Sequence, residues 1–506
     1  MRIETQDEAL AFLRAELARR DGQPPETAET HISLVLLGRS IAWKLKKAVR
    51  QPYLDFSTPE RRLALCEREL ELNRRTAPGL YRRVRRLTRT SDGTLTLDDE
   101  GTPVEAVLEM ARFDEDKLLD RMARRGALSL PLIARLAATI AAFHADAPTV
   151  ADARTSGSAR IEAVLRINEA GLEAGRAVFG DAATEAAVQA MRALWRRHRP
   201  LLDARQREGK VRRCHGDLHL RNIVEIDGEP VLFDCLEFDE EMATIDILYD
   251  LAFLVMDLWH RDLGALANLV FNRYLDAANE TAGLPLMPLF LAMRATVRAH
   301  VTASQALQGG ADADALAEEA RAYLDLARAL AAPPAPRLVA IGGYSGSGKS
   351  TAAARIAHAI GPAPGARILS SDRIRKALFG VAAETRLPDE AYRPEVSGTV
   401  YARQCEEAAR ILAAGHGVIA DAVAGRPEER AAIEAVAAAA GVDFAGFWLE
   451  APERMLVERV EARRGDPSDA TASVVRAQLG RDPGPMGWRR IDTRDGEAAE
   501  RIAAHL

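Results

Sequence analysis

The sequence contains few cysteines and few aromatic residues. Its four cysteines lie far apart, and none belongs to a Cys-x-x-Cys pair or to a His/Cys cluster with zinc-binding spacing. They are Cys66, Cys214, Cys235 and Cys405. Scattered thiols of this kind are typical of a reduced, cytoplasmic protein. Aromatic residues make up 5% of the chain, so we expect helix-rich domains whose cores consist of Leu, Ala and Val.

Long hydrophobic runs are also missing. The longest, such as Leu248–Leu258, contain Asp or are far too short to span a bilayer. The N-terminal stretch MRIETQDEALAFLRAEL is charged and amphipathic, and it lacks the apolar region of a signal peptide. We therefore expect neither a secreted protein nor a membrane partner.

Neither sign of charge is in large excess. The net charge is −6 and the pI is about 6.0. Residues 337–506 contain 23 Lys and Arg against 23 Asp and Glu, so this part of the chain is neutral. A protein that grips a nucleic-acid backbone usually presents a basic face. The composition therefore argues against a nucleic-acid partner.

A proline-rich segment marks a domain boundary. The chain has 506 residues, which is too long for one ordinary hydrophobic core. Ala331–Pro336 reads AAPPAP, and three prolines in six residues cannot continue a helix and favour an extended spacer. We predict a first domain over residues 1–330, a linker over 331–336 and a second domain over 337–506.

The first domain divides into a strand-rich and a helical part. Short apolar strands at Ile32–Leu37 and Ile41–Leu45 flank Gly38–Ser40, which is the pattern of a hairpin. A helix at Glu60–Arg75 follows, and further strands are expected at 81–88, 94–97 and 104–111. We expect a small lobe over about 1–113 and a larger, mostly helical lobe over about 114–330. Strand-like pieces around a polar loop interrupt the helical lobe at Val211–Phe233.

Strands and helices alternate in the second domain. Strands are expected at 338–342, 368–370, 417–421 and 443–449, and helices at 351–359, 397–414 and 427–440. Such alternation predicts a parallel α/β sheet with flanking helices.

The segment Cys214–Asn222 carries the strongest motif of the first domain. Asp217 and Asn222 have the Asp-x4-Asn spacing of a kinase catalytic loop. In that chemistry the aspartate accepts the proton of the substrate hydroxyl and the asparagine binds Mg²⁺. Asp234 ends the apolar strand Val231–Phe233, where a second metal ligand belongs.

Together these residues resemble the aminoglycoside phosphotransferase and choline kinase group. Asp246 and the run Tyr249–Ala252 are similar to the segment that follows the metal aspartate in that group. The resemblance covers roughly residues 30–330. It implies a two-lobed, protein-kinase-like α+β fold and ATP-dependent phosphorylation of a small-molecule hydroxyl, with Mg²⁺ as cofactor.

The resemblance also implies an ATP-binding lysine on the third strand of the small lobe and a glutamate on the next helix. Lys44 and Lys46 point to the same face of their strand, and Lys44 is preferred because it follows an apolar stretch. Glu69 is the preferred glutamate, with Glu67 as the alternative. Residues 109–113 would join the two lobes beside the adenine. The hairpin lacks a GxGxxG loop over the phosphates.

The second domain opens with a phosphate-binding sequence. Residues 343–350, GYSGSGKS, match the Walker A pattern between an expected strand and an expected helix. Glycines there let backbone N–H groups surround the phosphates of ATP at a helix N-terminus, the lysine reaches the β and γ phosphates, and the serine binds Mg²⁺. The predicted nucleotide-binding residues are Gly343, Ser345, Gly346, Ser347, Gly348, Lys349, Ser350 and Thr351.

Downstream residues indicate a kinase. Asp372 and Arg375 follow the second strand as Asp-x-x-Arg, which resembles polynucleotide kinase, gluconate kinase and zeta-toxin-like kinases. The resemblance implies that Asp372 activates the acceptor hydroxyl and Arg375 grips phosphate or substrate. The alternative is that Asp372 only caps a helix. Val418–Asp421 looks like a Walker B strand, in which Asp421 orients Mg²⁺ through water.

A basic helical segment near the C-terminus resembles the lid of small P-loop kinases. Arg459 and Arg463 are four residues apart and share a helix face, and Arg464 follows directly. A lid of this kind closes over the phosphates. The alternative is a solvated basic helix end.

The sequence therefore predicts a bifunctional kinase that joins two ATP-using phosphotransfer domains. Its domain order is similar to that of bacterial proteins described as aminoglycoside-phosphotransferase-like with an ATP-binding domain. In one alternative, a single domain is catalytic and the other senses nucleotide. In a second, the C-terminal domain phosphorylates a nucleic-acid 5′-hydroxyl or a nucleotide sugar. The sequence leaves the two acceptors and the oligomeric state open.

Overall fold

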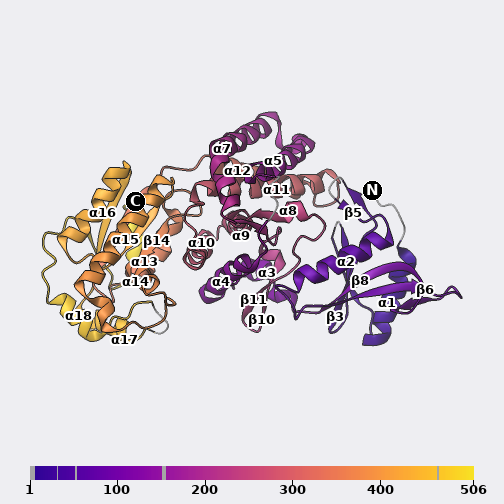
Figure 1. Ribbon diagram of the computed structural model, residues 1–506, viewed down its shortest axis with the longest axis horizontal. Coiled ribbons are helices and arrows are strands. Elements are labelled where there is room, and N and C mark those ends of the chain that lie inside the picture. Colours follow the sequence, from indigo (N-terminus) through magenta and orange to yellow (C-terminus); the bar gives the residue numbers. More distant parts are fainter. Residues whose placement is uncertain (1–5, 31, 52–53, 151–154, 464–466) are drawn as a thin grey trace. The chain divides into compact units, whose positions relative to one another are not determined.

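The computed structural model describes residues 6–506 except 31, 52–53, 151–154 and 464–466 (Figure 1). The contacts within the chain group it into two compact units. The first unit comprises residues 1–164 and 202–254, and the second comprises 165–201 and 255–506. Residues 255–330 are thus grouped with the C-terminal part of the chain. The predicted division at 331–336 stays a prediction.

An antiparallel sheet forms the small lobe of the first unit. Its strand order is β1-β2-β3-β8-β6-β7, and the hairpin of β2 and β3 confirms the prediction for this segment. The strands are β1 Glu26–Glu29, β2 Ser33–Leu37, β3 Ile41–Lys46, β6 Tyr81–Arg89, β7 Leu95–Leu97 and β8 Thr102–Ala111. Apolar residues of β2 and β3 pack against Leu13 and Leu17 of helix α1 (Asp7–Asp21), where they form a buried cluster.

Helix α2 (Pro59–Asn73) crosses the small lobe and confirms the predicted helix. Its first turn is capped by Thr58, whose hydroxyl accepts the N–H of Arg61, and a proline occupies the first helical position. Cys66, Glu69 and Asn73 are buried at spacings of three and four residues, so they lie on one face. That face carries Glu69 into the interior of the lobe, next to β3.

Short strands surround the polar loop of the larger lobe. Strand β9 (Val211–Arg213) pairs with β12 (Thr244–Asp246), and β10 (Ile223–Ile226) forms a hairpin with β11 (Glu229–Leu232). The loop between β9 and β10 ends in a single turn of 3-10 helix at Leu220–Asn222. Helices α4 (Leu130–Asp146) and α9 (Ile247–His260) supply side chains to this region.

The second unit contains a group of helices and a parallel sheet. Its helices include α10 (Gly264–Ala278), α11 (Met287–Leu307) and α12 (Ala313–Ala331), while α5 (Gly157–Ala174) and α7 (Asp181–Arg207) run across the limits of the two units. The sheet order is β14-β15-β13-β16-β17, and every pair is parallel. Its strands are β13 Arg337–Gly343, β14 Arg367–Ser370, β15 Val418–Asp421, β16 Asp443–Glu450 and β17 Arg489–Asp492.

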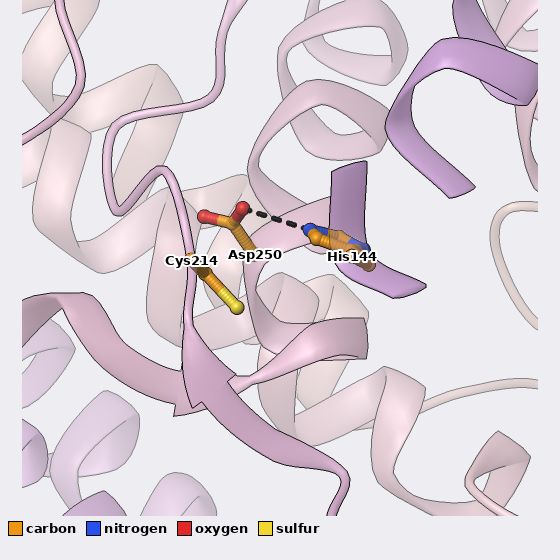
Figure 2. Close-up of side chains that lie close together, drawn as sticks. All are labelled: His144, Cys214 and Asp250. Carbon is orange, nitrogen blue, oxygen red and sulfur yellow. Dashed lines mark hydrogen bonds and ion pairs between the residues drawn. The ribbon is translucent and has the colours of Figure 1, made fainter. Parts of the chain in front are cut away.

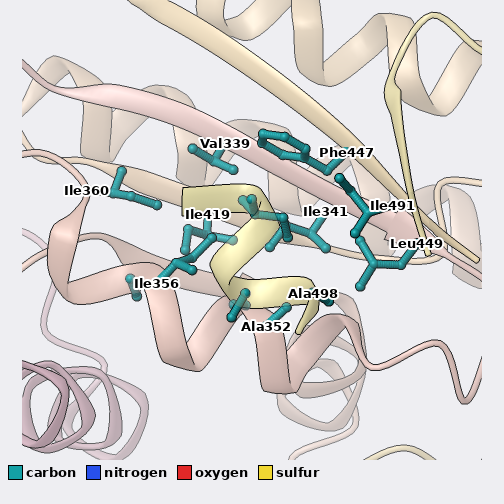
Figure 3. Packing of buried hydrophobic residues seen from close by; sticks show 14 of the residues in the cluster. Val339, Ile341, Ala352, Ile356, Ile360, Ile419, Phe447, Leu449, Ile491 and Ala498 are labelled. Carbon is teal, nitrogen blue, oxygen red and sulfur yellow. The ribbon is translucent and has the colours of Figure 1, made fainter. Parts of the chain in front are cut away.

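Helices cover the sheet and form its core with it. Side chains of α13 (Lys349–Ile356) and α19 (Ala498–Ala503) pack on β13, β15 and β16 in the cluster of Figure 3, which includes Val339, Ile341 and Phe447. The remaining helices are α14 Ser371–Leu378, α15 Pro394–Ala413, α16 Pro427–Ala440, α17 Glu453–Glu461 and α18 Ala472–Leu479. The sequence predicted this alternation but missed β17 and the helices α14, α18 and α19.

The chain thus combines an N-terminal α+β part, built on an antiparallel sheet, with a C-terminal α/β part, built on a parallel five-stranded sheet. Among the described helices, none is long and apolar enough to cross a bilayer.

Candidate active sites

His215 holds the loop that carries Asp217. The Asp217 N–H donates to His215 Nδ1 at 3.3 Å, and His215 Nε2 lies 3.0 Å from the carbonyl oxygen of Phe233. Because Nδ1 accepts a hydrogen bond, Nε2 bears the proton and donates it to Phe233. Burial lowers the pKa of His215, although nearby carboxylates oppose this, so the ring is held neutral in this tautomer. One side chain therefore ties the Asp217 loop to the segment before Asp234.

Asn222 connects Asp217 with the predicted metal ligand Asp234. Its side-chain nitrogen donates to the Asp217 carboxylate at 2.9 Å and to the Asp217 carbonyl oxygen at 3.0 Å. The backbone of Phe233 donates to the Asn222 carbonyl, so Asp234 follows directly across the β10–β11 ladder. With its nitrogen committed to Asp217, Asn222 leaves Oδ1 as its ligand atom. An amide oxygen beside a carboxylate fits Mg²⁺.

A buried carboxylate fixes the start of the same loop. Asp250 accepts the backbone N–H groups of His215 at 3.1 Å and Gly216 at 2.8 Å, and its Oδ2 lies 3.0 Å from His144 Nε2. Figure 2 shows His144, Cys214 and Asp250 side by side, with ligand atoms within 4.8 Å of one another. The Cys214 thiol already donates to the Ile245 carbonyl oxygen. These contacts make the cluster a hydrogen-bonded support for the loop rather than a metal site.

Lys44 contacts its predicted partner Glu69 and, in addition, the predicted metal ligand Asp234. Its ammonium lies 2.8 Å from Glu69 Oε1 and 2.5 Å from Asp234 Oδ1. Glu67 instead pairs with Arg86 on the surface. Burial alone would lower the pKa of Lys44, but the carboxylates of Asp234 and Glu69 outweigh it and raise the pKa. The lysine is therefore charged, as a phosphate-binding lysine must be.

Lys46 forms a second buried ion pair with the same glutamate. Its ammonium lies 2.7 Å from Glu69 Oε2 and also contacts the carboxylate of Glu237. Lys46 is 1% exposed, whereas the Lys44 side chain retains 13% exposure. Burial raises the pKa of Glu69, but the two ammonium groups outweigh this effect and lower it, so Glu69 is ionised. The two lysines are thus distinguished by exposure and by contact with Asp234.

The Walker A segment forms a glycine-rich loop between β13 and α13. Gly343, Gly346 and Gly348 have positive φ values of 135°, 86° and 91°, which only glycine adopts readily. At Gly346 an added Cβ would lie 2.4 Å from the Leu456 carbonyl oxygen. Among the residues described, the buried hydroxyl of Ser347 has no hydrogen-bond partner. A loop with turned backbone amides and an unpartnered hydroxyl fits a phosphate group.

Lys349, Ser350 and Asp421 lie at one end of this loop. The Lys349 ammonium donates to the Tyr344 carbonyl oxygen at 3.1 Å, and the Ser350 hydroxyl donates to Asp421 Oδ2 at 2.7 Å. Asp421 is the last residue of β15, next to β13 in the sheet. Their oxygen atoms form a donor set that suits Mg²⁺. Thr351 is the next residue of α13 and is exposed.

Asp372 and Arg375 lie in α14, directly after the edge strand β14. Partial burial raises the pKa of Asp372, while a hydrogen bond with Ser468 and the charge of Lys349 act in the opposite direction. Arg375 is buried and donates to the Ala391 carbonyl oxygen at 2.6 Å and to the Ser397 hydroxyl at 3.3 Å. Two of its donors are therefore already engaged by the protein.

The predicted lid arginines differ in their contacts. Arg459, in α17, donates to the carbonyl oxygen of Gly346 and to both Oγ1 and the carbonyl oxygen of Thr493. It thus joins the Walker A loop to the segment after β17. Arg463 follows the helix and is partly buried, whereas Arg464 lies outside the described residues.

Sequence reasoning missed several residues of both sites. Lys46 was considered only as an alternative to Lys44, and no local signal pairs it with Glu237. Asp250 lay in a segment noted for its resemblance, and its spacing from His215 gives no clue to their contact. In the second site, Gln478 accepts the Ser345 N–H at 2.8 Å from a helix that the sequence did not predict.

Two protein families have models that match parts of the chain. Residues 42–286 match the profile of the Phosphotransferase enzyme family, and residues 338–483 match that of an AAA domain. Solved structures similar to parts of the chain include a choline/ethanolamine kinase family protein from Mesorhizobium loti, with 15% identity and a TM-score of 0.37. That likeness covers 64% of this chain and 98% of the other. A gluconokinase from Sinorhizobium meliloti 1021 shows 25% identity and a TM-score of 0.24, covering 34% of this chain and 91% of the other.

Whole-chain relatives occur in mycobacteria. An uncharacterized protein from Mycobacterium tuberculosis strain H37Rv is 31% identical over 478 residues, which cover 92% of both chains. An uncharacterized protein from Mycobacterium bovis matches to the same extent. The chain therefore belongs to the family of these mycobacterial proteins, and in it a phosphotransferase-family domain precedes an AAA-family P-loop domain.

Proposed function

We propose that the protein is a bifunctional ATP-dependent kinase that phosphorylates a small-molecule hydroxyl at each of two sites. One observation carries the proposal: each site brings an acceptor-side carboxylate together with its own phosphate-binding lysine and magnesium ligands. In the first site these are Asp217, Lys44 and the pair Asn222–Asp234. In the second they are Asp372, Lys349 and the pair Ser350–Asp421. The proposal includes a cytoplasmic location and no nucleic-acid partner.

At the first site, Asp217 is the base. ATP with Mg²⁺ would supply the phosphoryl group and neutralise its charge, with Asn222 and Asp234 as ligands. Asn222 donates to Asp217 Oδ2 and so fixes the carboxylate that receives the hydroxyl proton. His215 and Asp250 hold the backbone of this loop in place before substrate binds. Lys44, ion-paired with Glu69, is oriented to bind phosphate oxygens.

At the second site, Asp372 is the base. The Walker A amides and Lys349 would hold the phosphates, with Ser350 and Asp421 at the metal. The raised pKa of Asp372 strengthens it as a proton acceptor. Arg375 holds the segment of Ala391 and Ser397 against α14, next to Asp372. Arg459 donates to the Gly346 carbonyl oxygen and so holds the Walker A loop in place.

Two substitutions test the proposal. Asp217→Asn and Asp372→Asn keep the size of each side chain but remove the base, and each should lower transfer at its own site about 100-fold or more. Phosphorylated products would be measured with ATP across a library of hydroxyl metabolites. Loss of a different product in each variant is the expected result.

Other outcomes select the alternatives. Loss of one product in both variants would contradict independent sites. Product loss in only one variant, with Mg·AMP-PNP still bound at both sites, would identify a catalytic domain with a nucleotide-sensing partner. Activity on 5′-hydroxyl oligonucleotides that falls steeply with salt would identify the C-terminal domain as a nucleic-acid kinase.

A further inference from the structure

Strand β14 is an edge strand of the parallel sheet, and helix α10 covers its free side. The sheet begins with β14, which pairs with β15 on its other side only. An open edge exposes backbone N–H and C=O groups that need partners. Helix α10 lies inside the phosphotransferase match and β14 inside the AAA match, yet both belong to the second unit. The contact between them therefore joins the two family domains within one compact body.

The Asn272 side chain makes backbone hydrogen bonds to β14 that a neighbouring strand would otherwise make. Its Oδ1 accepts the Ile368 N–H at 2.8 Å, and its Nδ2 donates to the Ala366 carbonyl oxygen at 3.1 Å. One turn earlier, Asn268 donates to the carbonyl oxygens of Pro364 and Ala366. The two amide side chains are 1% and 4% exposed, so these backbone groups are satisfied away from water. Removing a partner of this kind leaves a buried polar group unpaired.

Asp276 extends the same stripe to the segment that carries Asp372. Residues 268, 272 and 276 are four apart and so share one face of α10. Asp276 Oδ1 lies 2.5 Å from an Arg367 nitrogen, and Oδ2 lies 3.4 Å from Arg373. Arg373 directly follows Asp372 in α14. The carboxylate thus links the start of β14 and the first turn of α14 to one helix.

Buried aromatic rings also lie in the contact between α10 and the segment around β14. The Phe271 ring centroid lies 5.3 Å from that of His416, and His416 Nε2 lies 2.9 Å from the Gly365 carbonyl oxygen. At the start of α10, a Cβ added to Gly264 would lie 3.2 Å from the ring of His358. The helix therefore packs closely on the region before β14 as well as on the strand itself.

We propose that Asn272 and Asp276 are positioning residues for the second site: they hold β14 and the start of α14, and thereby Asp372, in place. Asp372 assumes its position only if the strand that precedes it is fixed. The nucleotide loop, in contrast, is built on β13 and α13 in the centre of the sheet. Substitution of the α10 residues should therefore reduce phosphoryl transfer without weakening nucleotide binding. This inference rests on the proposed role of Asp372, while the contact itself can be tested separately.

Hydrogen exchange in the full-length protein tests the contact. Asn272→Ala should speed amide exchange over residues 366–376 about tenfold, because the Ile368 N–H loses its acceptor. Exchange over 418–421 in the neighbouring strand should not change. Gln305→Ala is the control, since it removes an exposed amide side chain from helix α11. Unchanged exchange over 366–376 would overturn the proposal.

Activity tests the positioning role in an Asp217→Asn background, which silences the first site. The probe is ATP hydrolysis with water as acceptor, and Lys349→Met gives the zero level for the second site. Asp276→Asn, which keeps the shape of the side chain, should lower kcat about tenfold with KM for Mg·ATP within about twofold. Asp325→Asn is the control, because it removes an exposed carboxylate paired with Arg328.

The two measurements separate the possible failures. Unchanged kcat in Asp276→Asn would refute the positioning role even if exchange increased. A parallel rise in KM would also refute it, since the nucleotide loop would then depend on the helix. If the second site hydrolyses no ATP in the background protein, the metabolite library decides the proposed function, and exchange over 371–376 in Asp276→Asn decides whether α10 orders the segment. If Asn272→Ala does not fold, Asp276→Asn decides both points.

Discussion

At the scale of single residues, the two lysines of β3 have different surroundings despite sharing one glutamate. Lys44 contacts Asp234 and retains some solvent exposure, as a residue that meets phosphate needs. Lys46 lies between Glu69 and Glu237 with almost no exposure. A buried charge that loses its partner costs several kcal/mol, whereas a group facing a ligand site can be rehydrated. Structure and catalysis are therefore expected to depend on different lysines.

Methionine substitutions separate these roles. Lys46→Met should lower the free energy of unfolding by about 3 kcal/mol, because Glu237 and one oxygen of Glu69 lose their buried partner. Lys44→Met should lower it less but reduce transfer at the first site about 100-fold. Urea unfolding and initial rates would measure the two effects. Lys117→Met, at an exposed pair with Glu225, is the control and should change neither. Equal destabilisation by both substitutions at β3 would contradict the assignment.

The raised pKa of Asp372 predicts a pH dependence for the second site. A base must be ionised to act, so activity falls as the pH drops through its pKa. Because burial moves that pKa above its ordinary value of 3.8, the acid limb of kcat/KM should lie above pH 3.8. Ser468→Ala should shift the limb further upward, since a hydrogen bond to the ionised carboxylate is lost. Profiles would be recorded in the Asp217→Asn background. A downward shift in Ser468→Ala would contradict the assignment.

At the scale of elements, the Walker A loop depends on the absence of a side chain at Gly346. An added Cβ would meet the Leu456 carbonyl oxygen of α17, and the φ of 86° disfavours any L side chain. Gly346→Ala should therefore lower the free energy of unfolding by about 1–3 kcal/mol and weaken binding of Mg·AMP-PNP. Calorimetric titration and urea unfolding would measure both.

Gly398 offers a matched control for this substitution. It lies exposed in α15 with a helical backbone and no atom within 4 Å of an added Cβ. Gly398→Ala should raise the free energy of unfolding by about 0.5–1 kcal/mol and leave binding unchanged. Equal binding by the two alanine variants would show that the loop tolerates a side chain at position 346.

The order of helices and strands around both sites could be predicted because local sequence patterns specify it. Apolar strands, a helix at 59–73 that is capped by Thr58 and begins with a proline, and the glycine spacing of 343–348 each specify local structure. The acidic and basic partners could not be predicted, because Lys46–Glu237 and Asp276–Arg373 join residues far apart in the sequence. The edge position of β14 depends on strand order, which no local pattern contains. Strand β17 was missed because Arg489–Asp492 is short and polar.

At the scale of the whole molecule, the compact units do not coincide with the family matches. The phosphotransferase match spans residues 42–286, but its residues 165–201 and 255–286 belong to the second unit. Residues 255–286 thus belong by sequence to one family domain and by contact to the other. Helix α10 gives this overlap a physical basis, because its stripe of Asn and Asp satisfies the sheet edge. The two domains of this family are accordingly expected to fold interdependently.

The second unit also contains most of the histidines whose pKa is lowered. In the described part of the chain, four of the five histidines with lowered pKa lie there: His198, His260, His300 and His416. Burial lowers the pKa of His416 to about 4 from 6.5, and the charge of Arg367 adds to this effect. The unfolded chain binds the proton at a higher pH than the folded chain does. Stability supplied by the neutral ring is therefore complete above pH 6.5 and is lost as the pH falls toward 4.

Acid unfolding should consequently begin in the second unit. His416 alone should lower its free energy of unfolding by about 2 kcal/mol between pH 7 and pH 5. His416→Gln keeps a donor for the Gly365 carbonyl oxygen but does not titrate. It should therefore remove this contribution to the slope of the free energy of unfolding against pH. His505→Gln, at an exposed position, should leave the slope unchanged. Urea unfolding at the two pH values, followed by hydrogen exchange over 366–370 and 418–421, would measure the difference. A slope unaltered by His416→Gln would show that the ring beside Phe271 is protonated without loss of the sheet edge.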